Sequence, residues 1–269
     1  MPNYICVTCG CQYAATDTLP ESCMICEDER QYIGFKGQQW TTLDELRVGH
    51  HNRVETMEPN LTRIGTEPTF GIGQHMFLIQ APGGNVLWDC ITLIDEATVE
   101  SIRALGGLSA IAISHPHYYS SIIEWSQAFD NAPIYIHAAD RQWVTRPDPA
   151  IVYWEGDNHQ LGEGLTLING GGHFDGGTML HWAAAADGRG ALLAGDIIQV
   201  VPDTNWVSFM YSYPNLIPLS PDKVRRIVDA VEPFDFDRIY SPWLHRTVEK
   251  EGKAVVRRSA QRYVAAIRE

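Results

Sequence analysis

Histidine and aspartate residues stand at several places where a predicted strand ends, and these residue types bind metal ions. The apolar run 111–113 is followed by Ser114-His115-Pro116-His117, which puts two imidazoles two residues apart at a strand end. Neutral imidazole is a common ligand of zinc, and a His-x-His spacing can chelate one ion. The spacing is also compatible with two histidines that only cap a strand, so further ligands are needed to indicate a site.

Further residues of the same types follow this pattern along the chain. His173 lies in the glycine-rich turn 170–177, and His245 follows a predicted strand in the sequence SPWLH. Predicted apolar strands also end at Asp89 and, after a Gly195 step, at Asp196. We therefore expect loops far apart in the sequence to converge on one metal centre.

The N-terminal segment contains two Cys-x2-Cys pairs, Cys6 with Cys9 and Cys23 with Cys26. Two such pairs in a short segment are typical of a zinc site of the ribbon type. Two disulfides are the alternative, but nothing in the sequence indicates an oxidising compartment. The spacing predicts a zinc module with four cysteine ligands, in which the metal supplies much of the folding free energy.

Two cysteines remain outside these pairs. Cys11 could substitute as a ligand, but we expect it only to follow the first pair. Cys90 comes directly after Asp89 and could lie near the metal centre, although a buried structural thiol is the favoured interpretation.

Length, charge and hydrophobicity restrict the possible classes of protein. A chain of 269 residues with 45% hydrophobic residues can bury a full core and one small appendage. The sequence lacks an apolar run near 18 residues and a secretory signal, so we expect a cytoplasmic protein without a membrane partner. The net charge of -13 argues against a nucleic-acid partner.

The predicted elements suggest three segments: the four-cysteine module at 1–36, a connector at 37–60 and an α/β domain at 61–269. In the connector, Thr42 and Glu45 have the spacing of a capping box. Helices are expected at 95–105, 120–129, from Ser220-Pro221 onward and from about Glu249 onward. Strand and helix patterns alternate in this domain, which by itself indicates only an α/β or α+β fold.

The order of the candidate ligands resembles that of the metallo-beta-lactamase fold superfamily. This family has an Asp after an early strand, then H-x-H-x-D-H, a His after glycines, an Asp in a Gly-Asp step and a final His. The matching residues here are Asp89, His115, His117, His173, Asp196 and His245. The resemblance covers about residues 61–269 and implies a four-layer αββα sandwich. The N-terminal segment resembles zinc ribbons, and its Cys-x2-Cys-Gly opening is also similar to that of rubredoxins.

Two positions depart from the family pattern, since Tyr119 and Ser120 stand where it has Asp and His. The resemblance thus implies an intact first metal site and a degraded second one. Tyr119 would either donate a hydrogen bond to a developing oxyanion, a role open to Tyr118 as well, or only fill the space of the lost metal. His245 would assist a weak second metal with Asp196, donate a proton to a leaving group or have no catalytic role.

The resemblance also implies roles for the residues of the first metal site. His115, His117 and His173 would bind the metal, and Asp196 would be the fourth ligand or the base that orients a water. Asp89 would hold a ligand imidazole in its tautomer or pack the loop. Zinc suits these ligands, and iron or manganese would also fit.

The leading hypothesis is a hydrolase that uses a zinc-bound hydroxide on an ester, thioester, lactone or amide of a small molecule. An iron-dependent redox or oxygenase protein and a non-catalytic binding protein are the alternatives. The segment 197–219, rich in aromatic residues and proline, would wall a substrate pocket or form a homodimer contact. The acidic cysteine module is a further surface for a protein partner.

Overall fold

The computed structural model describes residues 1–268, which divide into two compact units. The first unit contains Met1–Ile136 and Arg141–Tyr153. The second contains His137–Asp140 and the described chain from Trp154 onward. Each unit is a β-sheet with its own helices and its own hydrophobic core, as an α/β fold requires.

The cysteine module belongs to the first unit and has little regular structure. Its strand β1 (Ile5–Cys6) pairs antiparallel with β2 (Trp40–Thr41) of the segment that follows, with Cys6 opposite Trp40. The short helix α1 (Met24–Glu27) begins directly after Cys23, so the second cysteine pair lies at a helix start. The module therefore has few apolar contacts of its own and depends on its cysteines and on the rest of the unit.

Residues 37–60, expected to be a connector, contain regular elements. Helix α2 (Leu43–Gly49) begins with the predicted capping box, in which Thr42 and Glu45 bond each other's backbone N–H groups. Strand β3 (His51–Glu58) then pairs antiparallel with β4 (Leu61–Glu67) along its length. β3 is half exposed and lacks an apolar alternation, which explains why the sequence did not reveal it.

The sheet of the first unit has seven strands in the order β3-β4-β5-β6-β7-β8-β9. After β3 and β4 the strands are β5 (Met76–Ile79), β6 (Val86–Trp88), β7 (Ala110–Ala112), β8 (Ile134–His137) and β9 (Ile151–Trp154). β6, β7 and β8 are parallel, and β5, β6 and β7 are wholly buried. Parallel strands end at the same edge of a sheet, so the residues after β6 and β7, Asp89 and the His115 loop, lie close together.

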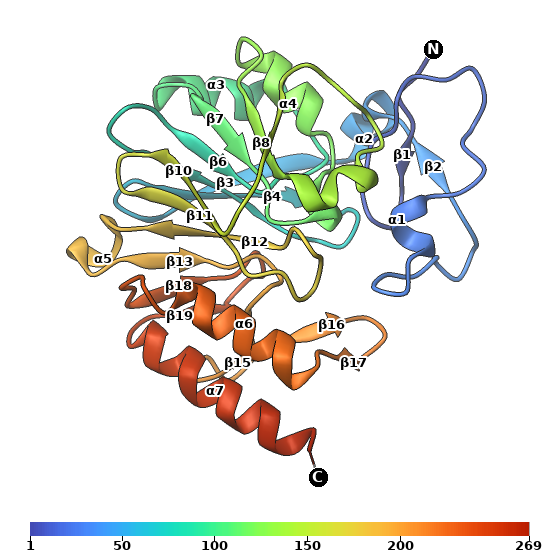
Figure 1. The fold of residues 1–269 in the computed structure, drawn as a ribbon. Helices are drawn as coiled ribbons and strands as arrows, with labels where there is room; N and C mark the ends of the chain where they lie inside the picture. Colours follow the sequence, from blue (N-terminus) through green and yellow to red (C-terminus); the bar gives the residue numbers. More distant parts are fainter. Residues whose placement is uncertain (269) are drawn as a thin grey trace. The chain divides into compact units, whose positions relative to one another are not determined.

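Helices cover the parallel strands of the first unit (Figure 1). They are α3 (Glu96–Ala104), α4 (Ile122–Ala128) and the 3-10 helix η1 (Pro116–Tyr118), with η2 (Ala138–Trp143) following β8. Asp95 caps α3 by accepting the N–H of Thr98, at the predicted helix start. Ile102 and Trp125 are buried in one core with Leu87 and Ile111 of the sheet.

The sheet of the second unit has six strands in the order β10-β11-β12-β13-β18-β19. They are β10 (Asn158–Gly162), β11 (Leu165–Asn169), β12 (Thr178–Trp182), β13 (Ala191–Leu193), β18 (Arg238–Tyr240) and β19 (Thr247–Val248). The short helix α5 (Ala185–Gly188) joins β12 to β13. β13 and β18 are parallel, so the loops after them, which carry Asp196 and Trp243, leave the sheet at the same edge.

Two long helices complete the second unit and lie side by side (Figure 1). Helix α6 (Pro221–Val231) has Ser220 as its N-cap and Pro221 at its first position, as predicted. Helix α7 (Gly252–Ala266) buries Val255, Val256 and Ala260. Both helices share a core with β11, β13 and β18.

The aromatic segment 197–219 forms two hairpins within the second unit. They consist of β14 (Gln199–Val200) with β15 (Val207–Ser208), and of β16 (Met210–Ser212) with β17 (Ile217–Pro218). Phe209 is fully buried and its ring meets that of Tyr263 on α7 edge to face. Much of this segment is thus part of the core of its unit.

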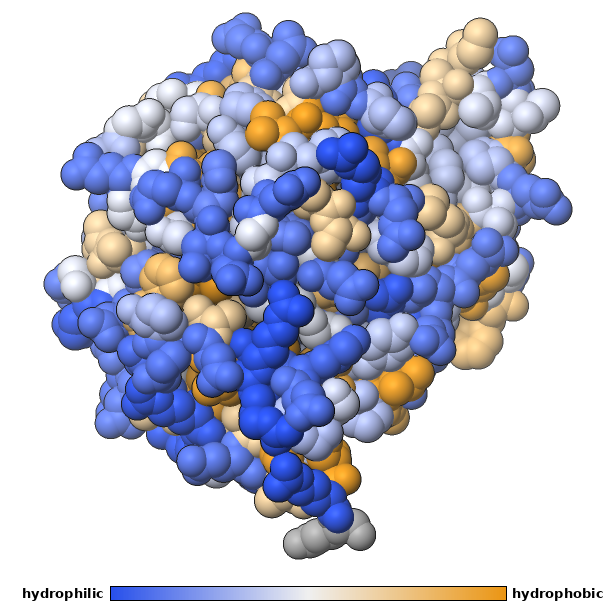
Figure 2. Space-filling view, in the orientation of Figure 1, coloured by the Kyte–Doolittle hydropathy of each residue, from blue (hydrophilic) through white to orange (hydrophobic). Residues whose placement is uncertain are grey.

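One face of the molecular surface can be compared by hydropathy. The face shown in Figure 2 is mostly hydrophilic, and hydrophobic residues appear there in small separate patches. Among residues 1–268, no helix combines the length and the apolar character that crossing a membrane requires.

Candidate metal centres

The four paired cysteines form a buried cluster in the first unit. Their sulfur atoms all lie within 4.8 Å of one another, with Cys6 and Cys26 at 3.6 Å and Cys9 and Cys23 at 3.7 Å. Bonds of about 2.3 Å to a tetrahedral zinc would put the sulfurs about 3.8 Å apart. The amide of Gln38 donates to the Cys6 sulfur at 3.3 Å, which favours a thiolate. The cluster fits a bound metal.

The two other cysteines lie outside this cluster. The thiol of Cys11 lies 3.2 Å from the hydroxyl of Thr145, and burial raises its pKa. Cys90 is fully buried and its thiol donates to the carbonyl of Ile91 at 3.2 Å. Burial also raises the pKa of Cys90, so both residues are inert thiols in the interior.

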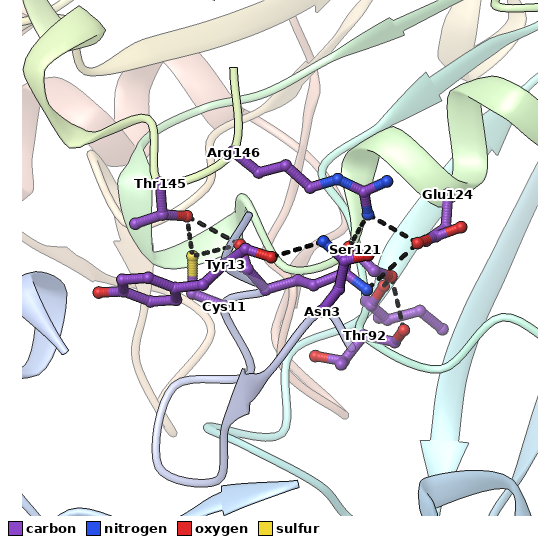
Figure 3. Close-up of polar contacts among 10 residues, drawn as sticks. Asn3, Cys11, Tyr13, Thr92, Ser121, Glu124, Thr145 and Arg146 are labelled. Atoms are coloured by element: carbon purple, nitrogen blue, oxygen red, sulfur yellow. Dashed lines mark hydrogen bonds and ion pairs between the residues drawn. The ribbon is translucent and has the colours of Figure 1, made fainter. Parts of the chain in front are cut away.

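The cysteine module is fixed to the rest of the first unit by polar contacts (Figure 3). The carbonyl of Gly10 accepts from the hydroxyl of Thr92 at 2.9 Å, and that of Gln12 accepts from Thr145 at 2.8 Å. The side chain of Gln12 bonds both Glu124 and Arg146, which also pair with each other at 2.6 Å. The residues after the first cysteine pair are thus buried among the loops around α4.

His115 and His117 lie in the turn that follows β7. His115 precedes η1 and Pro116 begins it, and the two imidazole rings are 5.0 Å apart. Nδ1 of His115 shares a hydrogen bond with the hydroxyl of Ser114 at 2.9 Å, which directs Nε2 the other way. Asp89 accepts the backbone N–H of Ser114 at 2.8 Å. Asp89 thus contacts the backbone of the His115 loop, and its predicted role beside the metal ligands stays a prediction.

His173 lies in the predicted glycine turn between β11 and β12. Gly172 has φ 82°, and a Cβ there would approach Cδ1 of Ile227 to 2.8 Å, so the turn requires glycine. Nδ1 of His173 donates to the backbone carbonyl of Tyr211 at 2.7 Å. A carbonyl oxygen can only accept, so Nδ1 is the protonated nitrogen of the neutral His173 ring and Nε2 is the nitrogen that could act as a metal ligand.

Asp196 follows β13 and is also held by the second unit. Its Oδ1 accepts the indole N–H of Trp243 at 3.2 Å, and its carbonyl accepts the hydroxyl of Tyr213 at 3.0 Å. Burial and the Asp196 carboxylate raise the pKa of Tyr213 well above its usual range. Tyr213 therefore stays a neutral donor beside Asp196.

His115, His117, His173 and Asp196 are all buried and make up a second set of residues whose side chains could hold a metal ion. Imidazole nitrogens and a carboxylate oxygen are ligands that zinc, iron and manganese accept. The hydrogen bonds of His115 and His173 described above both engage Nδ1, so Nε2 is the ring nitrogen of each residue that could act as a metal ligand. The donor set therefore fits a bound metal.

Comparison with known proteins places the chain in a family. No family model matches it. The uncharacterized protein YmaE of Bacillus subtilis (strain 168) is 52% identical over 269 residues, covering 99% of this chain and 97% of YmaE. This chain belongs to the YmaE family.

Solved structures similar to this YmaE-family protein are metallo-beta-lactamases. The DIM-1 metallo-beta-lactamase matches with a TM-score of 0.61 and 13% identity, covering 81% of this chain and 98% of that one. VMB-1 has a TM-score of 0.60 at 10% identity, with coverages of 81% and 99%. SMB-1 has a TM-score of 0.53 at 16% identity, with coverages of 80% and 97%. The YmaE-family chain has the metallo-beta-lactamase fold, as the ligand order predicted.

Tyr119 and Ser120, the two residues that depart from the ligand pattern described above, are both buried in the first unit. The Ser120 hydroxyl donates to the carbonyl of Cys90 at 3.3 Å and accepts from Gln74 at 3.1 Å. Tyr119 is buried and lines a cavity of about 10 Å³ beside Gln12. In the YmaE-family chain, Ser120 thus has a hydrogen-bonding role in the first unit.

His245 lies in the loop between β18 and β19, with φ 58° and an exposed side chain. Among residues 1–268, the groups that could hold a metal do not include it. Its catalytic role stays a prediction.

The sequence did not point to Ser114, Tyr211, Tyr213 or Trp243 as contacts of the candidate ligands. Ser114 and Trp243 stand beside or near a predicted ligand, which was an available signal. Tyr211 acts through its backbone carbonyl, for which a sequence contains no signal.

Proposed function

We propose that this YmaE-family protein is a hydrolase with one zinc ion at the catalytic site, bound jointly by His115, His117, His173 and Asp196. The observation that carries the proposal is the donor set, three imidazoles and a carboxylate on a metallo-beta-lactamase fold. The fold and the donors support a metal-dependent hydrolase in general. Zinc, the single metal and the substrate class belong to the proposal.

A bound zinc would supply Lewis acidity and a nucleophile at neutral pH. The chain's own residues orient the ligands: Tyr211 fixes the tautomer of His173, and Trp243 fixes one oxygen of Asp196. In this proposal the Asp196 carboxylate coordinates the metal or accepts a proton. Suitable substrates are esters, thioesters, lactones or amides, whose carbonyl groups a Lewis acid polarises.

The residues at the second site support a single catalytic metal. Neither the phenol of Tyr119 nor the hydroxyl of Ser120 is a good zinc ligand at pH 7, because each keeps its proton. The Ser120 hydroxyl is also engaged with Cys90 and Gln74. We infer that the first site does the chemistry without a second metal.

The test measures metal content and turnover on the full chain. We expect two metal equivalents, one at the cysteines and one at the histidines, and hydrolysis of members of an ester, thioester, lactone and amide panel. His117→Ala should lose one equivalent and the turnover, whereas His51→Ala, which changes an exposed histidine on β3, should keep both. One equivalent in the wild-type protein, or turnover that persists in His117→Ala, would contradict the proposal.

A further inference from the structure

A pocket of about 420 Å³ lies in the second unit, lined by residues that follow β13 and β18. One wall is Gln199, Val201 and Pro202 at the start of the aromatic segment. The other is the β18–β19 loop, with Trp243, Leu244 and Arg246. Segments that follow two different strands thus line this open pocket.

Trp243 connects this pocket to the candidate metal site. The residue lines the pocket, and its indole N–H donates to Asp196 Oδ1 at 3.2 Å. A molecule in the pocket would therefore lie one side chain away from a proposed metal ligand. This proximity suits the non-reacting part of a substrate.

Arg246 gives the pocket its charge. Arg189 and Arg257 of the same unit pair with Asp237 and Glu232, but Arg246 has no carboxylate partner in the described part of the chain. A guanidinium binds carboxylates through two parallel N–H donors. Gln199 supplies an amide in the same pocket.

The remaining lining residues determine which chemical group a bound anion carries beside its negative charge. Val201, Pro202, Trp243 and Leu244 offer apolar and aromatic surface. A single cation in a protein of net charge -13 suits a monoanion better than a phosphate dianion. The lining therefore matches a small carboxylic acid with an apolar body.

We propose that this pocket selects substrates that carry a free carboxylate and an apolar group, with Arg246 binding the carboxylate. The assignment rests on the proposed function, since it gives the substrate class of the same site. Hydrolysis would release an alcohol, thiol or amine from the part of the substrate at Asp196, and the carboxylate at Arg246 would remain unchanged.

The pocket assignment is tested by calorimetry on the full metal-loaded chain. The two ligands are 3-phenylpropionate and its neutral isostere 3-phenylpropanamide. Arg246→Gln should weaken binding of the carboxylate about tenfold or more, the loss expected for a charge-assisted hydrogen bond, and leave the amide unaffected. Arg246→Lys should keep part of the affinity. The matched control Arg225→Gln changes an exposed arginine on α6 and should have no effect.

Two further binding measurements distinguish a failure of the pocket assignment from a failure of the proposed hydrolase function. Phenylphosphonate should bind more weakly than the carboxylate, and His117→Ala should keep the Arg246-dependent binding, which excludes coordination to the metal as its source. Equal binding by Arg246→Gln, equal affinity for the amide, tighter binding of the phosphonate, or loss of binding in His117→Ala would overturn the pocket assignment. Arg246-dependent binding without any hydrolysis would support the pocket and count against the hydrolase.

Discussion

The backbone N–H of Gln12 donates a hydrogen bond to the carbonyl oxygen of Ser120 over 3.0 Å. Gln12 comes shortly after the first cysteine pair, and Ser120 follows the turn that carries His117. Since both belong to the first unit, this bond joins the four-cysteine module directly to the histidine loop. The cysteine metal and the histidine loop are therefore expected to depend on each other.

Cys23→Ser should remove the metal from the cysteine cluster and lower the melting temperature. The module has few apolar contacts of its own, so a loss of roughly 3 kcal/mol, or about 5–10 °C, is expected. Thermal unfolding with metal analysis checks this. Cys11→Ser changes a buried thiol outside the cluster and should keep the metal, so loss of the metal in Cys11→Ser would assign the ligands differently.

Gln12→Ala should destabilise the protein by about 1–3 kcal/mol, because it removes the bonds to Glu124 and Arg146 from a buried position. Denaturant unfolding measures the change in the free energy of unfolding. Gln39→Ala, at an exposed position just after the module, is the control and should differ little from wild type. Equal stability of the two variants would show that the Gln12 side chain does not hold the module in place.

Trp243→Phe should keep an aromatic side chain, although a smaller one, and remove the donor to Asp196. Groups that orient a metal ligand are worth about 10–100-fold in metal affinity or activity, so a loss of that size is expected. Titration of the metal-free protein with zinc measures the affinity. Trp206→Phe alters a tryptophan that stacks on Arg262 and should leave the affinity at the wild-type value.

His245→Ala should leave the metal content at the wild-type level, because the side chain is exposed and outside the proposed donor set. Metal analysis of the purified variant gives the answer. Loss of one equivalent of metal in this variant would show that His245 is a metal ligand. A lower kcat at full metal content would instead support its predicted role as a proton donor.

His181→Gln should make the protein less sensitive to mild acid. The ring is buried, its Nε2 donates to the carbonyl of Asp235 at 2.8 Å, and burial lowers its pKa. The lowered pKa means that His181 binds a proton less readily in the folded protein than in the unfolded chain. The contribution of neutral His181 to the free energy of unfolding is therefore complete above the unfolded pKa of about 6.5 and is lost as the pH falls below it. Denaturant unfolding between about pH 7 and 5 measures the slope of the free energy of unfolding against pH. Exposed His51→Gln should keep the wild-type slope, and an unchanged slope in His181→Gln would exclude His181 as its source.

Local patterns predicted much of this protein. The capping box of Thr42, the N-cap Asp95 and the Ser220-Pro221 helix start depend on neighbouring residues only, and each lies where expected. Strand β3 escaped prediction because its edge position leaves few apolar residues in its sequence. The two hairpins of 197–219 escaped because each of their strands is only two or three residues long.

The sequence by itself determined which residues can bind metal, since ligand chemistry and short spacing are local properties: His115 with His117, and the two cysteine pairs. Only the tertiary structure decided what holds them. The carbonyl of Tyr211 behind His173 and the indole of Trp243 against Asp196 are contacts between distant segments. The Tyr211 contact uses a backbone carbonyl, which is the same at every residue, so the sequence contains no signal for it. The Trp243 side chain is visible in the sequence, but its contact with Asp196 forms only when the strands and loops pack.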